Sequence, residues 1–401
     1  MVRPTHAIVD LGAIESNLRA IAAFVEHGGG PPFDPRSSAA PAPGLPRAAP
    51  PRIIAVVKAN AYGHGSMSVG LALERAGAAM LACADIEEGI VLRKAGVRIP
   101  ILVFGALGIS DLDGVFEYAL TPTISTPSAG RALAAAAERH ANPVASVFRR
   151  KDLRQHSHLK IDTGMNRLGF RHDNLARTLP EIAASEHLAI DAVYTHFATA
   201  DDPEHPAFAL QRERFERACA TIAQLGIRPE WRHAANSAAL LRDERVWYDF
   251  VRPGLLLYGI VPPPLAATLP LRPALSLHSR IVHVKGTRPG EGTGYGLTSV
   301  SDTARTIAIV PAGYADGLDR RLAGRGFMLV RGRRVPIVGS VCMDMTMIDV
   351  TGIAVSPGDD VVIVGEQDGG SLDVREIAAA IGTIPYELLC RVGTRIERQY
   401  V

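Results

Sequence analysis

Short apolar runs alternate with helical segments from Arg52 to about Gly259, and this alternation constrains the fold more than any other feature of the sequence. The runs expected to form strands are Ile53–Val57, Met80–Ala82, Ile99–Val103, Leu120–Ile124, His158–Ile161, Ala189–Tyr194 and a short one near Arg232. This number of βα units predicts a parallel (β/α)8 barrel of the TIM type, with a doubly wound sheet as the alternative. Polar motifs follow nearly every strand, and the barrel is favoured because it brings those loops to one face.

The residue pattern of the sequence changes at about residue 262, where a proline-rich linker leads into alternating β-rich segments. We therefore predict two domains, a barrel over residues 1–261 and a separate, mostly β domain over residues 262–401. The stretch 27–52 interrupts the barrel region with three glycines in a row, several prolines and repeated alanines. A segment of that composition cannot bury enough apolar surface to order itself, so a disordered or loosely packed insertion is expected.

Composition limits the kinds of partner. Apolar residues make up 47% of the 401 residues, enough for two well-buried domains. Lys and Arg number 43 against 41 Asp and Glu, and no basic run is long enough to suggest nucleic acid or a membrane surface. The four cysteines include no CxxC pair, so neither a metal site nor a disulfide framework is indicated. We expect a small-molecule partner, and a cytoplasmic location because the N-terminus has no signal-peptide core.

Lys58 follows five apolar residues of the first buried strand, in the segment Ile53–Gly65. Desolvation lowers the pKa of a lysine and makes it an amine nucleophile of the kind that forms Schiff bases. Tyr62 follows in a loop with Gly63 and Gly65, which let the backbone approach a ligand closely. The alternative is a strand-end lysine whose ammonium group extends to solvent.

Two further strands deliver polar groups into loops. Lys160, Asp162 and Arg167 lie in the run Leu159–Phe170, where they could form nothing more than an ion-pair cluster. His196 ends another strand, although a lone histidine is more often structural than catalytic. By themselves, these residues do not decide between a structural and a functional role.

Phosphate binding is suggested at two later positions. Ser237, after Asn236, supplies a hydroxyl at a helix start, where amides and the helix dipole attract an anion, although an ordinary N-cap is the alternative. Gly254 and Leu255 offer backbone amides late in the barrel, where phosphate sites are common. Arg252 precedes them, and its guanidinium can donate hydrogen bonds but does not give up its proton.

Together these motifs resemble the alanine racemase family, whose members are fold type III pyridoxal-phosphate enzymes. The resemblance rests on Ile53–Gly65, Leu159–Phe170 and Thr293–Gly296 among others, and it spans nearly the whole chain. It implies that Lys58 carries pyridoxal 5'-phosphate and that Tyr295 of the partner subunit is the second catalytic base of a homodimer. Two bases are needed because one proton leaves a face of Cα and another arrives on the opposite face.

The resemblance also assigns roles to other residues. It implies cofactor contacts from Lys58, Tyr62, Arg167, His196, Asn236, Ser237, Arg252, Gly254 and Leu255. It further implies substrate contacts from Arg167, Met343 and Asp344, a substrate entrance formed by Asp201, Tyr314 and Arg320, and carbamylation of Lys160. Arg252 would face the pyridine nitrogen without protonating it, which leaves the ring a weaker electron sink and favours prompt reprotonation.

The function that the resemblance implies is the racemisation of L-alanine and D-alanine, which supplies D-alanine for peptidoglycan. Thr394 stands where several relatives have an active-site tyrosine, so a serine or broad-specificity amino-acid racemase is an alternative. Ser340 stands where some relatives have an entrance arginine. A fold type III decarboxylase and a non-catalytic carrier of pyridoxal phosphate are further alternatives. The complete β domain with Tyr295 argues against the carrier.

Overall fold

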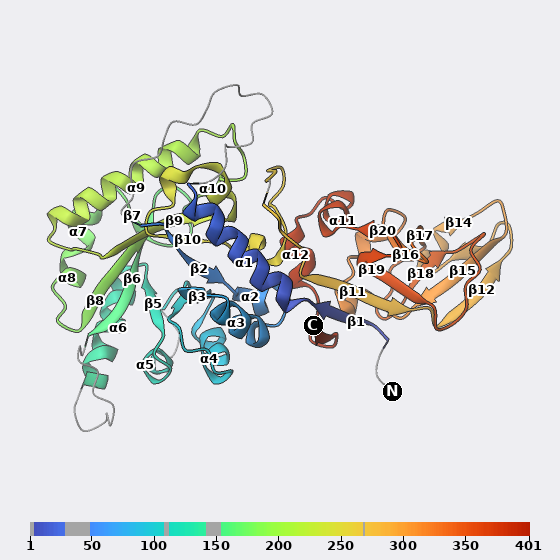
Figure 1. The fold of residues 1–401 in the computed structure, drawn as a ribbon, viewed down its shortest axis with the longest axis horizontal. Coiled ribbons are helices and arrows are strands. Elements are labelled where there is room, and N and C mark those ends of the chain that lie inside the picture. Colours follow the sequence, from blue (N-terminus) through green and yellow to red (C-terminus); the bar gives the residue numbers. More distant parts are fainter. Residues whose placement is uncertain (1–3, 29–48, 108–111, 142–153, 268) are drawn as a thin grey trace. The chain divides into compact units, whose positions relative to one another are not determined.

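The computed structural model describes residues 4–28, 49–107, 112–141, 154–267 and 269–401 (Figure 1). The chain divides into two compact units, each assembled from segments that are far apart in the sequence. The barrel unit consists of Ile14–Ala59 and Ser66–Arg272. The β unit consists of Met1–Ala13, Asn60–Gly65 and Pro273–Val401.

Within the described ranges, eight parallel strands form a closed barrel, which confirms the predicted fold. They are β2 (Arg52–Val56), β3 (Met80–Cys83), β4 (Ile101–Val103), β5 (Thr121–Ile124), β6 (Gln155–Asp162), β8 (Leu188–Tyr194), β9 (Trp231–Asn236) and β10 (Phe250–Arg252). They pair in the order β5-β4-β3-β2-β10-β9-β8-β6, and the pairing of Thr123 with His158 closes the ring. The short β7 (Phe170–Arg171) pairs with β6 outside this ring.

Helices alternate with the barrel strands along the chain, and in Figure 1 they lie around the strands. They are α1 (Leu11–Glu26), α2 (Lys58–Tyr62), α3 (Ser66–Arg75), α4 (Ile86–Lys94), α5 (Asp113–Glu117), α6 (Pro127–Ala141), α7 (Leu175–Thr178), α8 (Pro180–Ala183), α9 (Ala207–Gln224), α10 (Ser237–Arg242), and the 3-10 helices η1 (Glu244–Val246) and η2 (Leu255–Tyr258). At the start of α4, Asp85 accepts a hydrogen bond from the Glu88 amide at 2.8 Å and caps the helix.

Burial on both faces explains why the barrel strands read as continuous apolar runs. Ile54 and Ala55 in β2 are fully buried, because the barrel interior covers one face and helices cover the other. No strand is predicted at β10, which has only three residues and ends in the charged Arg252. Its place is fixed by parallel pairing with β2 and β9, which a local pattern does not indicate.

The β unit contains a large mixed sheet, as the β-rich texture predicts. Its strands pair in the order β12 (His283–Thr287), β15 (Arg305–Val310), β18 (Thr346–Asp349), β17 (Arg333–Val338), β16 (Phe327–Val330), β19 (Asp360–Gln367), β11 (Leu275–Arg280), β1 (His6–Val9) and β21 (Glu397–Tyr400), with β20 (Gly370–Leu372) beside β19. A separate two-stranded ribbon joins β13 (Gly292–Thr293) and β14 (Ser299–Val300). The helices are η3 (Tyr295–Leu297), η4 (Tyr314–Asp316), η5 (Arg320–Leu322), α11 (Val374–Ala380) and α12 (Pro385–Cys390).

The first strand, β1, lies in this sheet although residues 1–261 are predicted to form the barrel. It pairs antiparallel with β11, where His6 lies opposite His278, and parallel with β21, where His6 lies opposite Glu397. Both partners are distant in the sequence, and β21 lies at the other end of the chain, so no local sequence pattern reveals these pairings.

Most of the predicted insertion at 27–52 lies outside the described residues, between the end of α1 and the start of β2. Among the helices of the described ranges, none combines the length and the apolar character needed to cross a membrane.

Candidate active site

Lys58 begins α2, directly after the buried strand β2. This element is not an ordinary helix, because the four residues from Ala59 to Tyr62 have φ angles between 51° and 55°. Such values define a left-handed turn, a conformation that costs free energy for any residue with a Cβ. The backbone beside the candidate Schiff-base lysine is therefore strained, which the sequence does not indicate.

Hydrogen bonds on the barrel side hold the start of this turn. The carboxylate of Glu88 accepts hydrogen bonds from the amides of Ala59 and Ala84, at 2.6 and 2.8 Å. Further along, the amide of Gly65 donates to the carbonyl oxygen of Asn60 at 2.9 Å. A strained turn persists when its surroundings hold it from both ends, as here.

Packing within the β unit explains the two glycines that follow. A Cβ on Gly63 would lie 2.1 Å from the carbonyl oxygen of Leu389, and one on Gly65 would lie 1.9 Å from the hydroxyl of Tyr400. The glycines thus permit close approach to protein atoms, whereas the sequence suggests approach to a ligand. Tyr62 is itself buried, and burial raises the pKa of its hydroxyl well above the ordinary value.

Arg252 is the centre of a hydrogen-bond network inside the barrel. Its Nη1 lies 2.7 Å from Nδ1 of His233, and its Nη2 donates to the carbonyl oxygens of Thr195 and Ala234 at 2.7 and 2.9 Å. Nη2 also lies 3.2 Å from Nδ1 of His196. Because a guanidinium only donates hydrogen bonds, Nδ1 of His233 is an acceptor and carries no proton.

Positive charge gathers around His196 at the carboxyl end of the barrel strands. Burial, together with the charges of Arg167 and Arg252, lowers the pKa of Lys160 to about 8. Burial also lowers the pKa of His196 well below its ordinary value, with added effects from the charges of Arg252, Lys160, Arg167 and Lys58. Such a concentration of cations is suited to an anionic ligand.

The loop after β6 carries Arg167. Oδ1 of Asp162 accepts hydrogen bonds from the amides of Gly164 and Asn166, at 3.0 and 3.1 Å. Asp162 therefore folds the loop back on itself through backbone contacts, a role beyond the simple ion-pair cluster considered from the sequence. Arg167 follows this turn and is exposed.

The candidate phosphate residues meet where β9 ends and η2 begins. Oδ1 of Asn236 accepts a hydrogen bond from the amide of Ala239 at 2.9 Å, so the N-cap of α10 is Asn236, not Ser237. Oγ of Ser237 instead accepts from the amide of Gly254 at 2.9 Å. This bond brings Ser237 beside Gly254 and Leu255.

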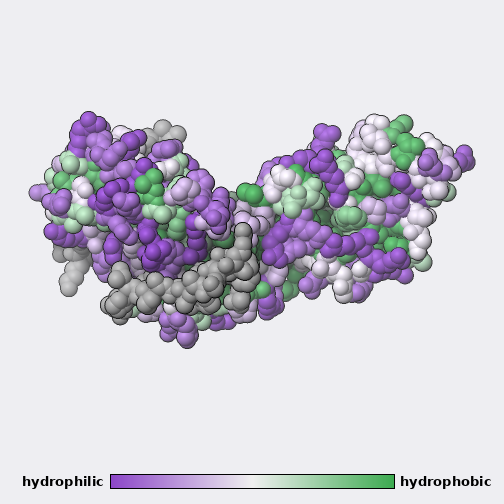
Figure 2. Space-filling view, turned by 90° about the horizontal axis from the view of Figure 1, so that it is seen from above, coloured by the Kyte–Doolittle hydropathy of each residue, from purple (hydrophilic) through white to green (hydrophobic). Residues whose placement is uncertain are grey.

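Tyr295 lies on the surface of the β unit, with 77% of its area exposed. Oγ of Ser340 donates a hydrogen bond to its carbonyl oxygen at 2.8 Å and so supports the tyrosine backbone. Leu297, Val300 and Met343 are also exposed, and Figure 2 shows hydrophobic residues among hydrophilic ones on the surface of this unit.

Arg395 holds Asp344, which the resemblance assigns to substrate binding. Nη2 of Arg395 donates to Oδ1 of Asp344 at 2.6 Å, and Nε donates to Oδ1 of Asp316 at 2.7 Å. Asp316 is fully buried and also accepts from the amide of Gly313 at 2.9 Å. Arg395, which the sequence analysis does not single out, thus links a buried carboxylate to an exposed one.

The residues predicted for a substrate entrance are divided between the units. Asp201 is exposed in a turn of the barrel unit. Tyr314 and Arg320 are exposed in the β unit, where they begin η4 and η5. The amide of Tyr314 donates to the carbonyl oxygen of Cys342 at 2.9 Å, which ties η4 to the segment before Met343.

Comparison with known proteins places the chain in a family. Two family models match it, described as alanine racemase, N-terminal domain, at residues 45–262 and alanine racemase, C-terminal domain, at residues 274–400. An alanine racemase of Symbiobacterium thermophilum is 39% identical over 401 residues, which cover 100% of this chain and 97% of the relative. The chain belongs to the alanine racemase family.

Solved structures of alanine racemases share the fold. The alanine racemase of the D-cycloserine producer Streptomyces lavendulae matches with a TM-score of 0.87 and 32% identity, covering 100% of this chain and 98% of that chain. The alanine racemase of Bartonella henselae, solved with covalently bound pyridoxal phosphate, matches with a TM-score of 0.82 and 25% identity over 99% of both chains. Membership in this family identifies the chain as an amino-acid racemase.

Gln211 is a residue near the racemase site that the sequence analysis misses. Its Nε2 donates to the carbonyl oxygen of His196 at 3.0 Å and to Oγ1 of Thr163 at 3.2 Å. Its Oε1 accepts from the amide of Ala198 at 2.9 Å. Gln211 is 2% exposed in α9, and an amide side chain on the buried face of a helix is the signal that could have found it.

Proposed function

We propose that this racemase interconverts L-alanine and D-alanine with pyridoxal 5'-phosphate as its cofactor. The observation that carries the proposal is the positive charge that Arg252 and Arg167 place around His196. A phosphorylated cofactor is an anion, and cationic and amide donors bind it strongly. The covalently bound pyridoxal phosphate of the Bartonella henselae relative supports the same cofactor.

The residues present suit the parts of this cofactor. Lys58 would hold it covalently, and its further contacts are proposed for Tyr62, Arg167, His196, Asn236, Ser237, Arg252, Gly254 and Leu255. When bound, pyridoxal phosphate withdraws electrons from Cα of the amino acid and makes its proton acidic. Arg252, which can only donate, would bind the pyridine nitrogen without transferring a proton to it.

Racemisation then requires proton exchange on both faces of Cα. We assign Lys58 to the proton of the D-enantiomer and Tyr295 of the partner subunit to the proton of the L-enantiomer. The exposure of Tyr295 beside apolar Leu297 and Val300 supports a homodimer, because contact with a second copy would cover this surface. Met343 and Asp344 would contact the substrate, together with Arg167.

The remaining assignments rest on the family and on single contacts. Asp201, Tyr314 and Arg320 are proposed to line the substrate entrance. Carbamylation of Lys160 is supported by its lowered pKa of about 8, since the neutral amine is the form that reacts with carbon dioxide. Cytoplasmic D-alanine production for peptidoglycan is proposed from the family alone.

The test is chiral chromatography of L-alanine, L-serine and L-lysine after separate incubation with the protein and pyridoxal phosphate. Conversion of alanine alone to a racemic mixture is expected. Comparable conversion of all three would move the protein to the broad-specificity class and contradict the substrate assignment. No conversion of any substrate would overturn the proposal.

A further inference from the structure

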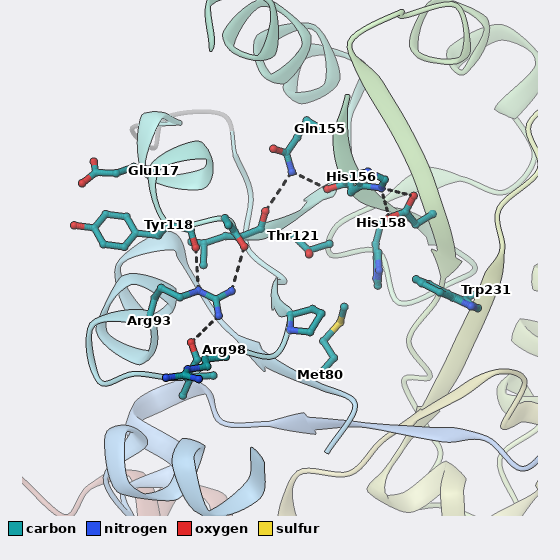
Figure 3. Close-up of a pocket in the computed structure, with 15 residues that line it drawn as sticks. Met80, Arg93, Arg98, Glu117, Tyr118, Thr121, Gln155, His156, His158 and Trp231 are labelled. Carbon is teal, nitrogen blue, oxygen red and sulfur yellow. Dashed lines mark hydrogen bonds and ion pairs between the residues drawn. The ribbon is translucent and has the colours of Figure 1, made fainter. Parts of the chain in front are cut away.

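A cavity lies in the barrel unit at the end opposite Lys58. It has a volume of about 730 Å³ and is lined by residues that begin the barrel strands, including Met80 of β3, Gln155 of β6 and Trp231 of β9 (Figure 3). Lys58 follows the carboxyl end of a strand, whereas these residues stand at the amino ends. The volume is in the range of small-molecule sites, and the racemase site does not account for it.

A chain of two buried histidines leads from Arg252 to this cavity. Nη1 of Arg252 lies 2.7 Å from Nδ1 of His233, and Nε2 of His233 lies 3.0 Å from Nδ1 of His158. The guanidinium can only donate, so neutral His233 carries its proton on Nε2 and donates it to His158. Neutral His158 must then carry its own proton on Nε2. Burial, followed by the charge of Arg252, lowers the pKa of both rings and keeps them neutral.

The Nε2–H group at the end of this chain lacks an acceptor. His158 is 0% exposed, and among the described residues no hydrogen-bond partner contacts its Nε2. Figure 3 shows its ring among the side chains that line the cavity, between Thr121 and Trp231. A buried donor without an acceptor costs free energy, and an acceptor bound in the cavity would remove that cost.

The other charged groups of the cavity already have partners inside the protein. Arg93 donates to the carbonyl oxygens of Tyr118, Val97 and Ile99 at 3.0, 2.7 and 3.0 Å. Nδ1 of His156 lies 2.8 Å from Oδ2 of Asp191. Arg98 and Glu117 are exposed and contribute one charge of each sign. The cavity therefore has no excess charge to recruit an ion.

The lining of the cavity includes the apolar side chains of Trp231, Met80 and Leu120. We propose that this cavity binds a small, uncharged heteroaromatic molecule that accepts a hydrogen bond from Nε2 of His158. An aromatic ring gains from packing against the indole of Trp231, and its acceptor atom satisfies the buried donor. The same contact polarises the hydrogen bonds that run through His233 to Arg252, and it thereby connects the cavity to the racemase site. This connection rests on the proposed function, whereas binding of the ligand in the cavity does not.

Quinoline and indole are the matched probes, because both are two-ring aromatics but quinoline accepts a hydrogen bond and indole only donates. Binding to the full-length protein is measured by ligand-observed NMR titration. We expect quinoline to bind. The substitution His158→Phe keeps a ring of similar shape, and it should weaken the binding of quinoline about three- to tenfold while leaving the binding of indole unchanged. The control His140→Phe, a surface histidine in α6, should change neither probe.

Circular dichroism of each variant checks that it is folded. A second variant, Trp231→Leu, should weaken the binding of both probes. Failure of quinoline to bind the folded wild-type protein would overturn the proposal. Equal binding of quinoline to wild type and a folded His158→Phe variant would overturn it as well. Quinoline binding by a protein that racemises no amino acid would support this site and contradict only the proposed function.

Discussion

Replacing Ala59 with glycine should stabilise the protein, although glycine normally weakens helices. Ala59 is exposed and has a φ of 52°, in a turn whose four residues all have positive φ. A left-handed conformation costs an L-residue roughly 1–2 kcal/mol, and glycine avoids this cost because it has no Cβ. The greater freedom of glycine in the unfolded chain offsets about 0.5–1 kcal/mol, so a net gain of about 0.5–1 kcal/mol is expected.

Thermal unfolding at one fixed protein concentration is the assay, since oligomerisation would otherwise alter the midpoint. The gain should raise Tm by about 1–3 °C. Ala22, an exposed alanine inside the ordinary helix α1, is the matched control. Ala22→Gly should lower stability by about 0.5–1 kcal/mol, and Ala59→Val should also lower it because a β-branched residue fits poorly at positive φ. An equal loss of stability in Ala59→Gly and Ala22→Gly would refute the strained turn.

Three other changes test the racemase site. Tyr295→Phe should abolish L-to-D turnover while the visible absorbance of the bound cofactor persists, and wild-type activity would remove Tyr295 from the mechanism. Gln211→Ala should cost about 1–3 kcal/mol in urea unfolding, because the buried Gln211 side chain loses its hydrogen bonds to Thr163, His196 and Ala198; a change below about 0.5 kcal/mol would contradict this role. With its pKa lowered from 10.5 to about 8, unmodified Lys160 should make stability rise by about 3 kcal/mol between pH 8 and 10.5, because the unfolded chain binds more protons there. Lys160→Met should flatten that rise in stability. If the stability of the wild-type protein does not rise over this pH range, the amine is modified.

The fold could be predicted because its signals are local. Five apolar residues before Lys58 indicate a doubly buried strand, and the repetition of such runs with helical segments between them indicates a barrel. The change of texture near residue 262 likewise marks the β-rich part. The short β10 was beyond this reasoning, since three residues carry too little periodicity to distinguish a strand.

The candidate site could be predicted only in part. Residues such as Lys160 and Arg252 stand out as charges in or after apolar strands, and the structure brings their charges together around His196. Gln211 gives no comparable signal, because its importance comes from three contacts to loops that are distant in the sequence. Likewise, only the fold shows that Asn236, and not Ser237, caps α10.

By itself, the sequence determined the order of most strands and helices and the residue types available for chemistry, because periodicity and side-chain chemistry are local properties. It also determined that a barrel is followed by a β-rich part. The tertiary structure decided where β1 pairs and which atoms Arg252 contacts. It also decided that the residues after Lys58 turn left-handed. These features depend on contacts between distant segments, which overrule local preference when enough of them act together.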